Sequence, residues 1–287
     1  MREENIEFEY LRFADDINIF TNNKGDAKKI LKKLIKNLRE LYLNIQDKKT
    51  KIFENTQIEK LIDEKQDTIA AIDYGIDDDD LTIEPIGLDK LINLFEETIK
   101  CSDDFNKAHF NACIARFKKI KNDYAVEYIL DKLEEKPDFA KPFSQYLNIF
   151  INDSNRIKNT ISNFLSNSEK NIYEWQEMWF LILLENADNL NKNQLKLVRR
   201  ISKDHNKHWA ARAFAVIALG KHGDESDRAY IKSEYTDEGN IYIKKAILIA
   251  SHKMNKPERN LFYDTVLREN NSELNRLLSY LKSTDNP

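Results

Sequence analysis

Apolar and polar residues alternate along residues 7–13 and again along residues 17–20, on either side of the acidic pair Asp15-Asp16. Alternation with a period of two is typical of strands, and two such segments around a short turn predict a β-hairpin. An Asp-Asp turn is not the usual Asn-Gly turn of a hairpin. Adjacent carboxylates repel one another, so their presence here suggests that they serve a function.

A helical period follows the hairpin. Apolar residues recur at i, i+3, i+4 and i+7 between about Ala27 and Tyr42, which predicts a helix with one buried face. Its other face is basic; the residues are Lys28, Lys29, Lys32, Lys33, Lys36 and Arg39. We interpret this face as solvated surface, with nucleic-acid contact as the alternative. Residues 49–53 are typical of a strand, so residues 1–54 are expected to form a hairpin, a helix and a strand.

The periodicity weakens over residues 55–86, which we interpret as a connector with one short strand at 81–83. Asp77-Asp78-Asp79-Asp80 lies in this segment. A solvated acidic loop is the preferred interpretation, because no partner ligands for a metal site are in view.

Helical apolar stripes dominate the chain from Gly87 onward. They cover 88–100, 105–120, 123–135, 139–151, 155–166, 171–186, 191–203, 207–219, 226–236, 240–252, 257–269 and 272–282. The segment around Ala213 aligns with that around Ala246, at an offset of 246 − 213 = 33 residues. Small and aliphatic residues at such an offset predict stacked helix pairs, an α-solenoid. HEAT units are longer, about 40–47 residues, so we describe the pairs as HEAT-like.

The expected fold is therefore mostly α, with a small α+β segment followed by an α-solenoid of HEAT-like helix pairs. Its divisions are 1–54, the connector 55–86, a helical segment 87–135 and the repeats 136–287. Only 6 glycines and 5 prolines occur, which also favours helices over a turn-rich sheet protein.

Composition limits the class of protein further. The net charge of −4 does not exclude nucleic-acid binding, because the distribution of charge matters more than its sum. Cys101 and Cys113 form no CxxC pair, which favours a reduced, cytoplasmic protein. No apolar run approaches the roughly 18 residues of a membrane span, and no secretory signal follows Met1.

Several other residue types invite a functional interpretation. His205 and His208 lie close together, but no cysteine or carboxylate completes a zinc site, so we assign them to surface or packing. His222 is expected in a helix-terminating turn. The tryptophans lie on apolar stripes and are expected in the core, with a stacking platform for single-stranded nucleic acid as the alternative; they are Trp175, Trp179 and Trp209.

The hairpin sequence carries a resemblance to a known family. Phe13-Ala14-Asp15-Asp16, preceded by Leu11-Arg12 and followed by an apolar strand, resembles the YxDD motif of bacterial reverse transcriptases. The segment from Leu43 to Ile52, with its Lys49-Thr50 pair, is similar to the next palm motif of these enzymes. Two motifs in the right order and spacing are more specific than either one alone.

The resemblance implies residue roles. Asp15 would bind metal, Asp16 would support it, and Phe13 and Ala14 would lie beside the primer end or the incoming nucleotide. Lys49 would stabilise the leaving pyrophosphate. Two-metal phosphoryl transfer uses ions about 3.5–4 Å apart, and Mg²⁺ takes oxygen ligands such as carboxylates. The implied cofactor is therefore Mg²⁺.

The sequence also departs from the family pattern. Only fourteen residues precede Asp15, so the fingers and the first palm Asp are expected to come from an upstream segment or a partner chain. A fragment, one half of a split enzyme and a relic remain open as explanations. The implied partners are DNA or RNA and dNTPs, with a homo-oligomer as a weaker expectation and no membrane.

The helical C-terminal part resembles the layout of abortive-infection and other defence-associated reverse transcriptases. That similarity implies phage defence, and DNA synthesis that is untemplated and primed from a tyrosine in some members. The sequence does not single out a priming residue among its 12 tyrosines. The alternative is a non-catalytic helical-repeat interaction scaffold that carries a vestigial palm segment.

Overall fold

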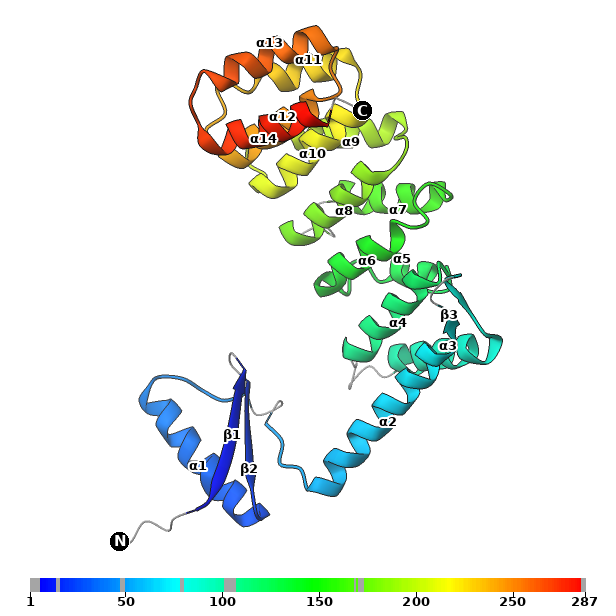
Figure 1. The fold of residues 1–287 in the computed structure, drawn as a ribbon, viewed down its shortest axis with the longest axis vertical. Helices are drawn as coiled ribbons and strands as arrows, with labels where there is room; N and C mark the ends of the chain where they lie inside the picture. Colours follow the sequence, from blue (N-terminus) through cyan, green and yellow to red (C-terminus); the bar gives the residue numbers. More distant parts are fainter. Residues whose placement is uncertain are drawn as a thin grey trace. The chain divides into compact units, whose positions relative to one another are not determined.

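The structure is a computed structural model that describes residues 6–13, 16–46, 50–77, 80–100, 107–167, 169 and 173–284, without the side chains of 59–66. The chain divides into two compact units, Met1–Tyr74 and Gly75–Pro287. Helices dominate, and the described strands form two small antiparallel sheets (Figure 1). The expectation of a mostly α chain with a small β-hairpin is therefore confirmed.

The first unit begins with the predicted hairpin. Strands β1 (Phe8–Phe13) and β2 (Asp16–Thr21) pair antiparallel, from Phe8 opposite Thr21 to Phe13 opposite Asp16. Helix α1 (Lys24–Glu40) begins three residues earlier than expected. The reason is Asn23, whose side chain accepts a hydrogen bond from the Asp26 amide at 2.9 Å and caps the helix.

Two expectations for the following residues need revision. The strand expected over 49–53 is wrong for the described residues 50–53, which form none. Thr50 instead bonds locally, because its amide and its hydroxyl both donate to the Gln46 carbonyl at 3.1 Å. The segment interpreted as a connector contains the 20-residue helix α2 (Asn55–Tyr74), then β3 (Ile76–Asp77) and β4 (Thr82–Ile83). The short strand near 81–83 is confirmed.

The second unit consists mainly of helices, and each of the helical stripes in the sequence contains one. They are α3 (Pro85–Lys100), α4 (Lys107–Lys119), α5 (Val126–Asp131), α6 (Ala140–Leu147), α7 (Asn155–Ser166), α8 (Glu174–Asn186), α9 (Lys192–Lys203), α10 (Trp209–His222), α11 (Glu225–Ser233), α12 (Ile241–Ser251), α13 (Lys256–Leu267) and α14 (Ser272–Ser283). A short 3-10 turn, Pro137–Phe139, precedes α6.

These helices pack in two rows. Helices α4, α6, α8, α10, α12 and α14 contact one another in sequence and form the first row, while α5, α7 and α9 follow one another in the second (Figure 1). Helices α9, α11 and α13 each pack on the first-row helix that follows them in the chain. Every helix pair therefore packs chiefly on the pairs before and after it, as in repeat proteins.

Close packing within the first row depends on small residues. Gly220 of α10 faces Ala250 of α12 so closely that a Cβ built on Gly220 would lie 2.4 Å from the Ala250 Cβ. Large side chains fill the wider spaces; Phe110, Phe143, Phe180 and Tyr263 are fully buried. Among the described residues, no helix is both long and apolar enough to cross a membrane.

Ion pairs connect successive helix pairs. Lys207, ahead of α10, contacts the buried carboxylate of Glu177 in α8 at 2.8 Å, across 30 residues of sequence. Arg212 of α10 contacts Glu238, ahead of α12, at 2.9 Å across 26 residues, and both side chains are almost completely buried. These two ion pairs therefore join neighbouring repeats, because their partners lie about one repeat apart in the sequence.

Candidate active site

The end of the N-terminal hairpin brings together two of the five predicted site residues, one substrate-binding and one catalytic. Phe13 is the last residue of β1, and it pairs with Asp16, the first residue of β2. Directly opposed residues in an antiparallel ladder project from the same face of the sheet. Phe13 and Asp16 therefore share one face. Ala14, Asp15 and Lys49 lie outside the described residues.

The face that carries Phe13 and Asp16 is exposed, and half of its six side chains are apolar. Side chains alternate between faces, so Leu11 and Phe20 project on the same side. The exposed fractions are 83 % for Phe13, 65 % for Leu11 and 49 % for Phe20. Leu11 entered the sequence-based prediction only as part of the family motif, and Phe20 only as part of an alternating strand. The signal that could have grouped them with Phe13 is the strand pairing, which places all three on one face.

Helix α1 packs on strand β2 and covers part of the opposite face. Ile19 and Thr21, which share that face, are the half-buried residues of β2. The apolar stripe of α1 is half-buried at best, and no described residue of α1 is fully buried. Amphipathic helices usually bury their apolar face in a core. The hairpin and α1 therefore carry apolar surface that this unit does not itself bury.

Every residue on the basic face of α1 is exposed to solvent. Each of its six cations has an exposed side chain: Lys28, Lys29, Lys32, Lys33, Lys36 and Arg39. Lys29 lies 3.7 Å from Asp26 one turn earlier in the helix. Exposure agrees with solvated surface and equally with phosphate contact, so both interpretations stay open.

The metal-binding capacity of the described hairpin is partial. Asp16 offers an exposed carboxylate, and carboxylate oxygen is the ligand type that Mg²⁺ takes. Within the described part of the chain, no three residues of the types His, Cys, Asp or Glu group closely enough to hold a metal ion. The donor chemistry therefore fits Mg²⁺, whereas a complete ligand set needs residues beyond those described.

The other candidate clusters have structural roles. The Asp77 carboxylate accepts a hydrogen bond from the Asp80 amide at 3.1 Å, while Asp78 and Asp79 lie outside the described residues. His208 Nδ1 accepts from the Ala210 amide at 3.2 Å and caps α10, while His205 lies 3.5 Å from Glu234. Helix α10 ends at His222, as the sequence predicted.

The prediction that the tryptophans are core residues is wrong for two of the three. Trp175 is 54 % exposed and Trp209 is 40 % exposed, while Trp179 is half-buried. Trp175 and Trp209 lie in the first turns of α8 and α10. A residue in the first turn can satisfy the apolar period and still project beyond the end of the helix, past the neighbouring helices.

Comparison with known families addresses the N-terminal segment. Residues 1–69 match the family model described as "Reverse transcriptase (RNA-dependent DNA polymerase)". No curated protein and no solved structure matches the chain. The match includes the hairpin, helix α1 and most of α2. The N-terminal segment of this chain is therefore reverse transcriptase-like.

Proposed function

We propose that residues 1–54 belong to the palm of an RNA-directed DNA polymerase and that the chain is the C-terminal portion of this enzyme. The observation that carries the proposal is the hairpin end. Phe13 opposes Asp16 across the ladder, with Asp15 next to it in sequence, on the face that α1 leaves uncovered. An acidic hairpin end within a reverse transcriptase-like segment fits nucleotidyl transfer, in which carboxylates hold the divalent ions.

In this proposal Asp15 and Asp16 are metal ligands, with Asp15 as the principal one. Bound Mg²⁺ ions would neutralise charge on the nucleotide phosphates. Phe13 and Ala14 would position the nucleotide or the primer end from the same hairpin. Lys49 would stabilise the charge on the departing pyrophosphate.

The remaining ligands would come from a fingers and palm segment encoded upstream or carried by a partner chain. The exposed apolar side chains on this face support this part of the proposal, since exposed apolar surface marks interaction sites. Leu11, Phe13 and Phe20 together would contact that segment. Asp16, on the same face, would then lie near the first palm Asp that the segment carries.

The helical unit has a proposed role of its own. Residues 87–135 would act as a thumb-like segment, and residues 136–287 would form HEAT-like repeats that hold product or a partner. The two-row packing and the 33-residue offset support the repeat assignment. With a reverse transcriptase-like segment ahead of it, this layout favours a role in anti-phage defence.

The test is incorporation of labelled dNTPs in the presence of Mg²⁺, with protein produced from the whole genomic locus, including any coding sequence upstream. Incorporation should be lost in Asp15→Ala and in Asp16→Ala, and in wild type after chelation of the metal. Asp153→Asn is the matched control, because it removes an exposed carboxylate in the helical unit. That variant should retain wild-type incorporation.

Absence of incorporation from the intact locus, with and without template and primer, would contradict the enzyme proposal. The chain would then be a helical interaction scaffold with a vestigial palm segment. The defence role is tested separately, by plaque counts on cells that carry the wild-type locus or the Asp15→Ala locus. Equal plaque counts on both would argue against a role for polymerase activity in defence.

A further inference from the structure

Three exposed aromatic side chains recur at one position of successive first-row helices. Trp175, Trp209 and Tyr242 lie in the first turns of α8, α10 and α12. Their exposed fractions are 54 %, 40 % and 51 %. The sequence intervals, 209 − 175 = 34 and 242 − 209 = 33, match the offset of the internal repeat. We call these three residues the aromatic row.

The rings of the row are held in defined orientations by neighbouring aromatic side chains. Trp209 and Tyr242 stack with centroids 4.4 Å apart and planes inclined by 24°. Trp175 meets Trp179, one turn further along α8, edge to face at 5.7 Å. Helices α8, α10 and α12 pack directly on one another, so the row follows one edge of the first row of helices. Exposed rings that are oriented by such contacts suit stacking of a further flat group on the outer side of the row.

Cations accompany the aromatic rings. The ammonium group of Lys141 lies 5.7 Å from the centroid of Trp179, and that of Lys245 lies 5.4 Å from the centroid of Tyr242. Lys141 also lines a cavity of about 370 Å³ between α4 and α6, together with Lys118, Asn111 and Gln145. Lys141 thus lies between this cleft and Trp179, the ring partner of Trp175. The cleft also has apolar lining from Ile114, Ala115 and Pro142.

Three carboxylates near this edge are already neutralised by cations. Glu177 is bonded to Lys207 at 2.8 Å, and Glu238 is bonded to Arg212 at 2.9 Å. Glu273 forms an ion pair with Lys245. These pairs limit the repulsion that an incoming polyanion would meet. Stacking on the rings, rather than net charge, would provide most of the attraction.

We propose that the aromatic row binds unpaired bases of a single-stranded nucleic acid, while Lys118 and Lys141 in the α4–α6 cleft contact its phosphates. Every base offers a flat π face, so aromatic platforms bind single strands with little sequence preference. A duplex keeps those faces stacked inside the helix and cannot offer them. The inference concerns the helical unit alone and does not depend on polymerase activity of the hairpin.

A proline-rich peptide is the main competitor, because aromatic grooves also bind polyproline helices. A second copy of this chain is another. The lysine-lined cleft at the end of the row favours the nucleic acid, since phosphates complement these cations whereas proline rings do not. Both competitors are separate outcomes of the test.

The test uses the full chain and a fluorescein-labelled 20-nucleotide oligothymidine, with a duplex of equal length for comparison. We expect the single strand to quench tryptophan fluorescence and to bind at least tenfold more tightly than the duplex. Trp209→Ala and Tyr242→Ala should each weaken binding by about five- to 100-fold. Trp209→Phe keeps an aromatic ring and should retain most of the affinity for the single strand. This variant therefore separates loss of stacking from loss of folding.

Two matched variants serve as controls. Tyr280→Ala removes a 65 % exposed tyrosine of α14 outside the row and should leave binding unchanged. Lys141→Ala should lower the slope of log K against log salt concentration by about 0.7 per lost phosphate contact. Lys196→Ala, on the exposed side of α9, should leave that slope as it is.

The proposal is overturned if duplex and single strand bind equally, or if folded Trp209→Ala and Tyr242→Ala bind as wild type. It is also overturned if only a proline-rich peptide quenches the tryptophans. Self-association that is lost in Trp209→Ala, without oligonucleotide binding in the wild type, would assign the row to an interface between copies of the chain.

Discussion

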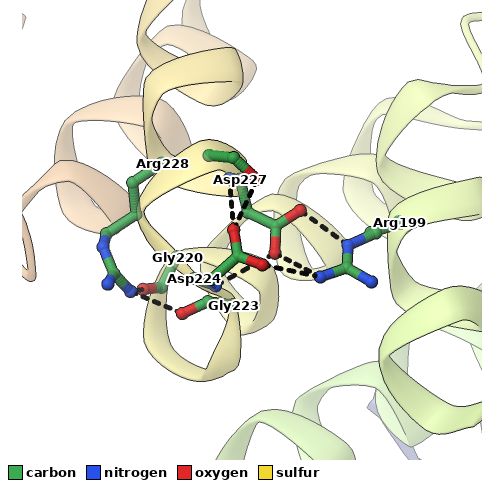
Figure 2. Close-up of polar contacts among 7 residues, drawn as sticks. Arg199, Gly220, Gly223, Asp224, Asp227 and Arg228 are labelled. Atoms are coloured by element: carbon green, nitrogen blue, oxygen red, sulfur yellow. Dashed lines mark hydrogen bonds and ion pairs between the residues drawn. The ribbon is translucent and has the colours of Figure 1, made fainter. Parts of the chain in front are cut away.

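Arg199 of α9 and Asp227 of α11 form a bidentate ion pair, with Nε 2.6 Å from Oδ1 and Nη2 2.7 Å from Oδ2 (Figure 2). The side chain of Asp227 is 7 % exposed and that of Arg199 is 37 % exposed. Asp227 also accepts from the Asp224 amide at 3.0 Å, within a capping box that starts α11. Arg228 bonds the Gly223 carbonyl from the other side at 2.6 Å. The α10–α11 loop is thus fixed to α9.

Replacing Arg199 with methionine should destabilise the chain. The substitution leaves the Asp227 carboxylate buried without its charged partner, and stranded charges are costly. Because Arg199 is partly exposed, we expect about 1–3 kcal/mol rather than the larger penalty of a fully buried pair. Urea denaturation followed by circular dichroism measures this loss.

Arg200→Met is the control for Arg199→Met, because Arg200 is the exposed neighbour in the same helix turn. Its effect should stay within about 0.5 kcal/mol. Equal losses in the two variants would mean that the ion pair contributes nothing beyond a generic effect of removing positive charge from α9.

Gly220→Ala should force α10 and α12 apart. The new methyl group would lie 2.4 Å from the Ala250 Cβ and 2.5 Å from the Ala250 Cα, and backbone cannot move aside cheaply. We expect a loss of about 1–3 kcal/mol from overpacking, despite the better helix propensity of alanine. Gly239→Ala is the control, since a Cβ there meets nothing within 4 Å. The measurement is the thermal unfolding midpoint of both variants and of wild type. A Gly220→Ala protein as stable as wild type would contradict the close approach of α10 and α12.

His222 should make stability depend on pH. Burial lowers the pKa of His222 below its usual 6.5, while its Nε2 contacts the Glu185 carbonyl at 3.0 Å. The folded state therefore holds the proton less tightly than the unfolded state does. The contribution of His222 to stability is complete above pH 6.5 and is lost as the pH falls from 6.5 through the lower folded pKa.

The measurement for His222 is the urea midpoint at pH 7.5 and at pH 5.5, in wild type and in His222→Gln. Wild type should lose more stability between the two pH values than the variant does. Carboxylates titrate in both proteins, so the difference between them isolates the histidine. A parallel loss in both proteins would refute the assignment.

Cys113 should be unreactive until the chain unfolds. It is completely buried, and burial raises the pKa of its thiol to about 12. Thiolate, rather than thiol, is the reactive species. In a Cys101→Ser background, a thiol reagent at pH 8 should label the native protein slowly and the urea-unfolded protein at once. Fast labelling of the native protein would mean that α4 opens readily.

The sequence predicted most of the helices because their apolar stripes repeat with the helical period over long stretches. Helix α2 was missed because its apolar residues are sparse. Ile58, Leu61 and Ile62 recur at helical spacing, but Lys65 interrupts the stripe before it resumes at Ile69 and Ile72. The strand expected at 49–53 failed for a different reason. A five-residue segment forms a strand only where a neighbouring strand supplies hydrogen bonds, and Thr50 instead bonds to the Gln46 carbonyl four residues earlier.

The sites divide in a similar way. The hairpin could be predicted from the alternation of residues 7–13 and 17–20, but its register could not. Asp16 was expected in the turn, and it is instead the first residue of β2, opposite Phe13. The exposure of Trp175 and Trp209 could not be foreseen, because periodicity carries no information on where a helix ends relative to its neighbours. The Arg199–Asp227 pair joins residues 28 apart. The only local sign of it was the capping box that Asp224 and Asp227 form at the start of α11.

The lack of fully buried residues in α1, β1 and β2 has a consequence for local opening. A two-stranded ribbon is marginal in water without further cover, and opening free energy follows the density of buried contacts. Amide protons of β1 and β2 should therefore exchange with solvent far faster than those of α10, which packs tightly on α12 where Gly220 contacts Ala250. Whatever covers the hairpin would slow that exchange, so protection of these strands reports directly on assembly.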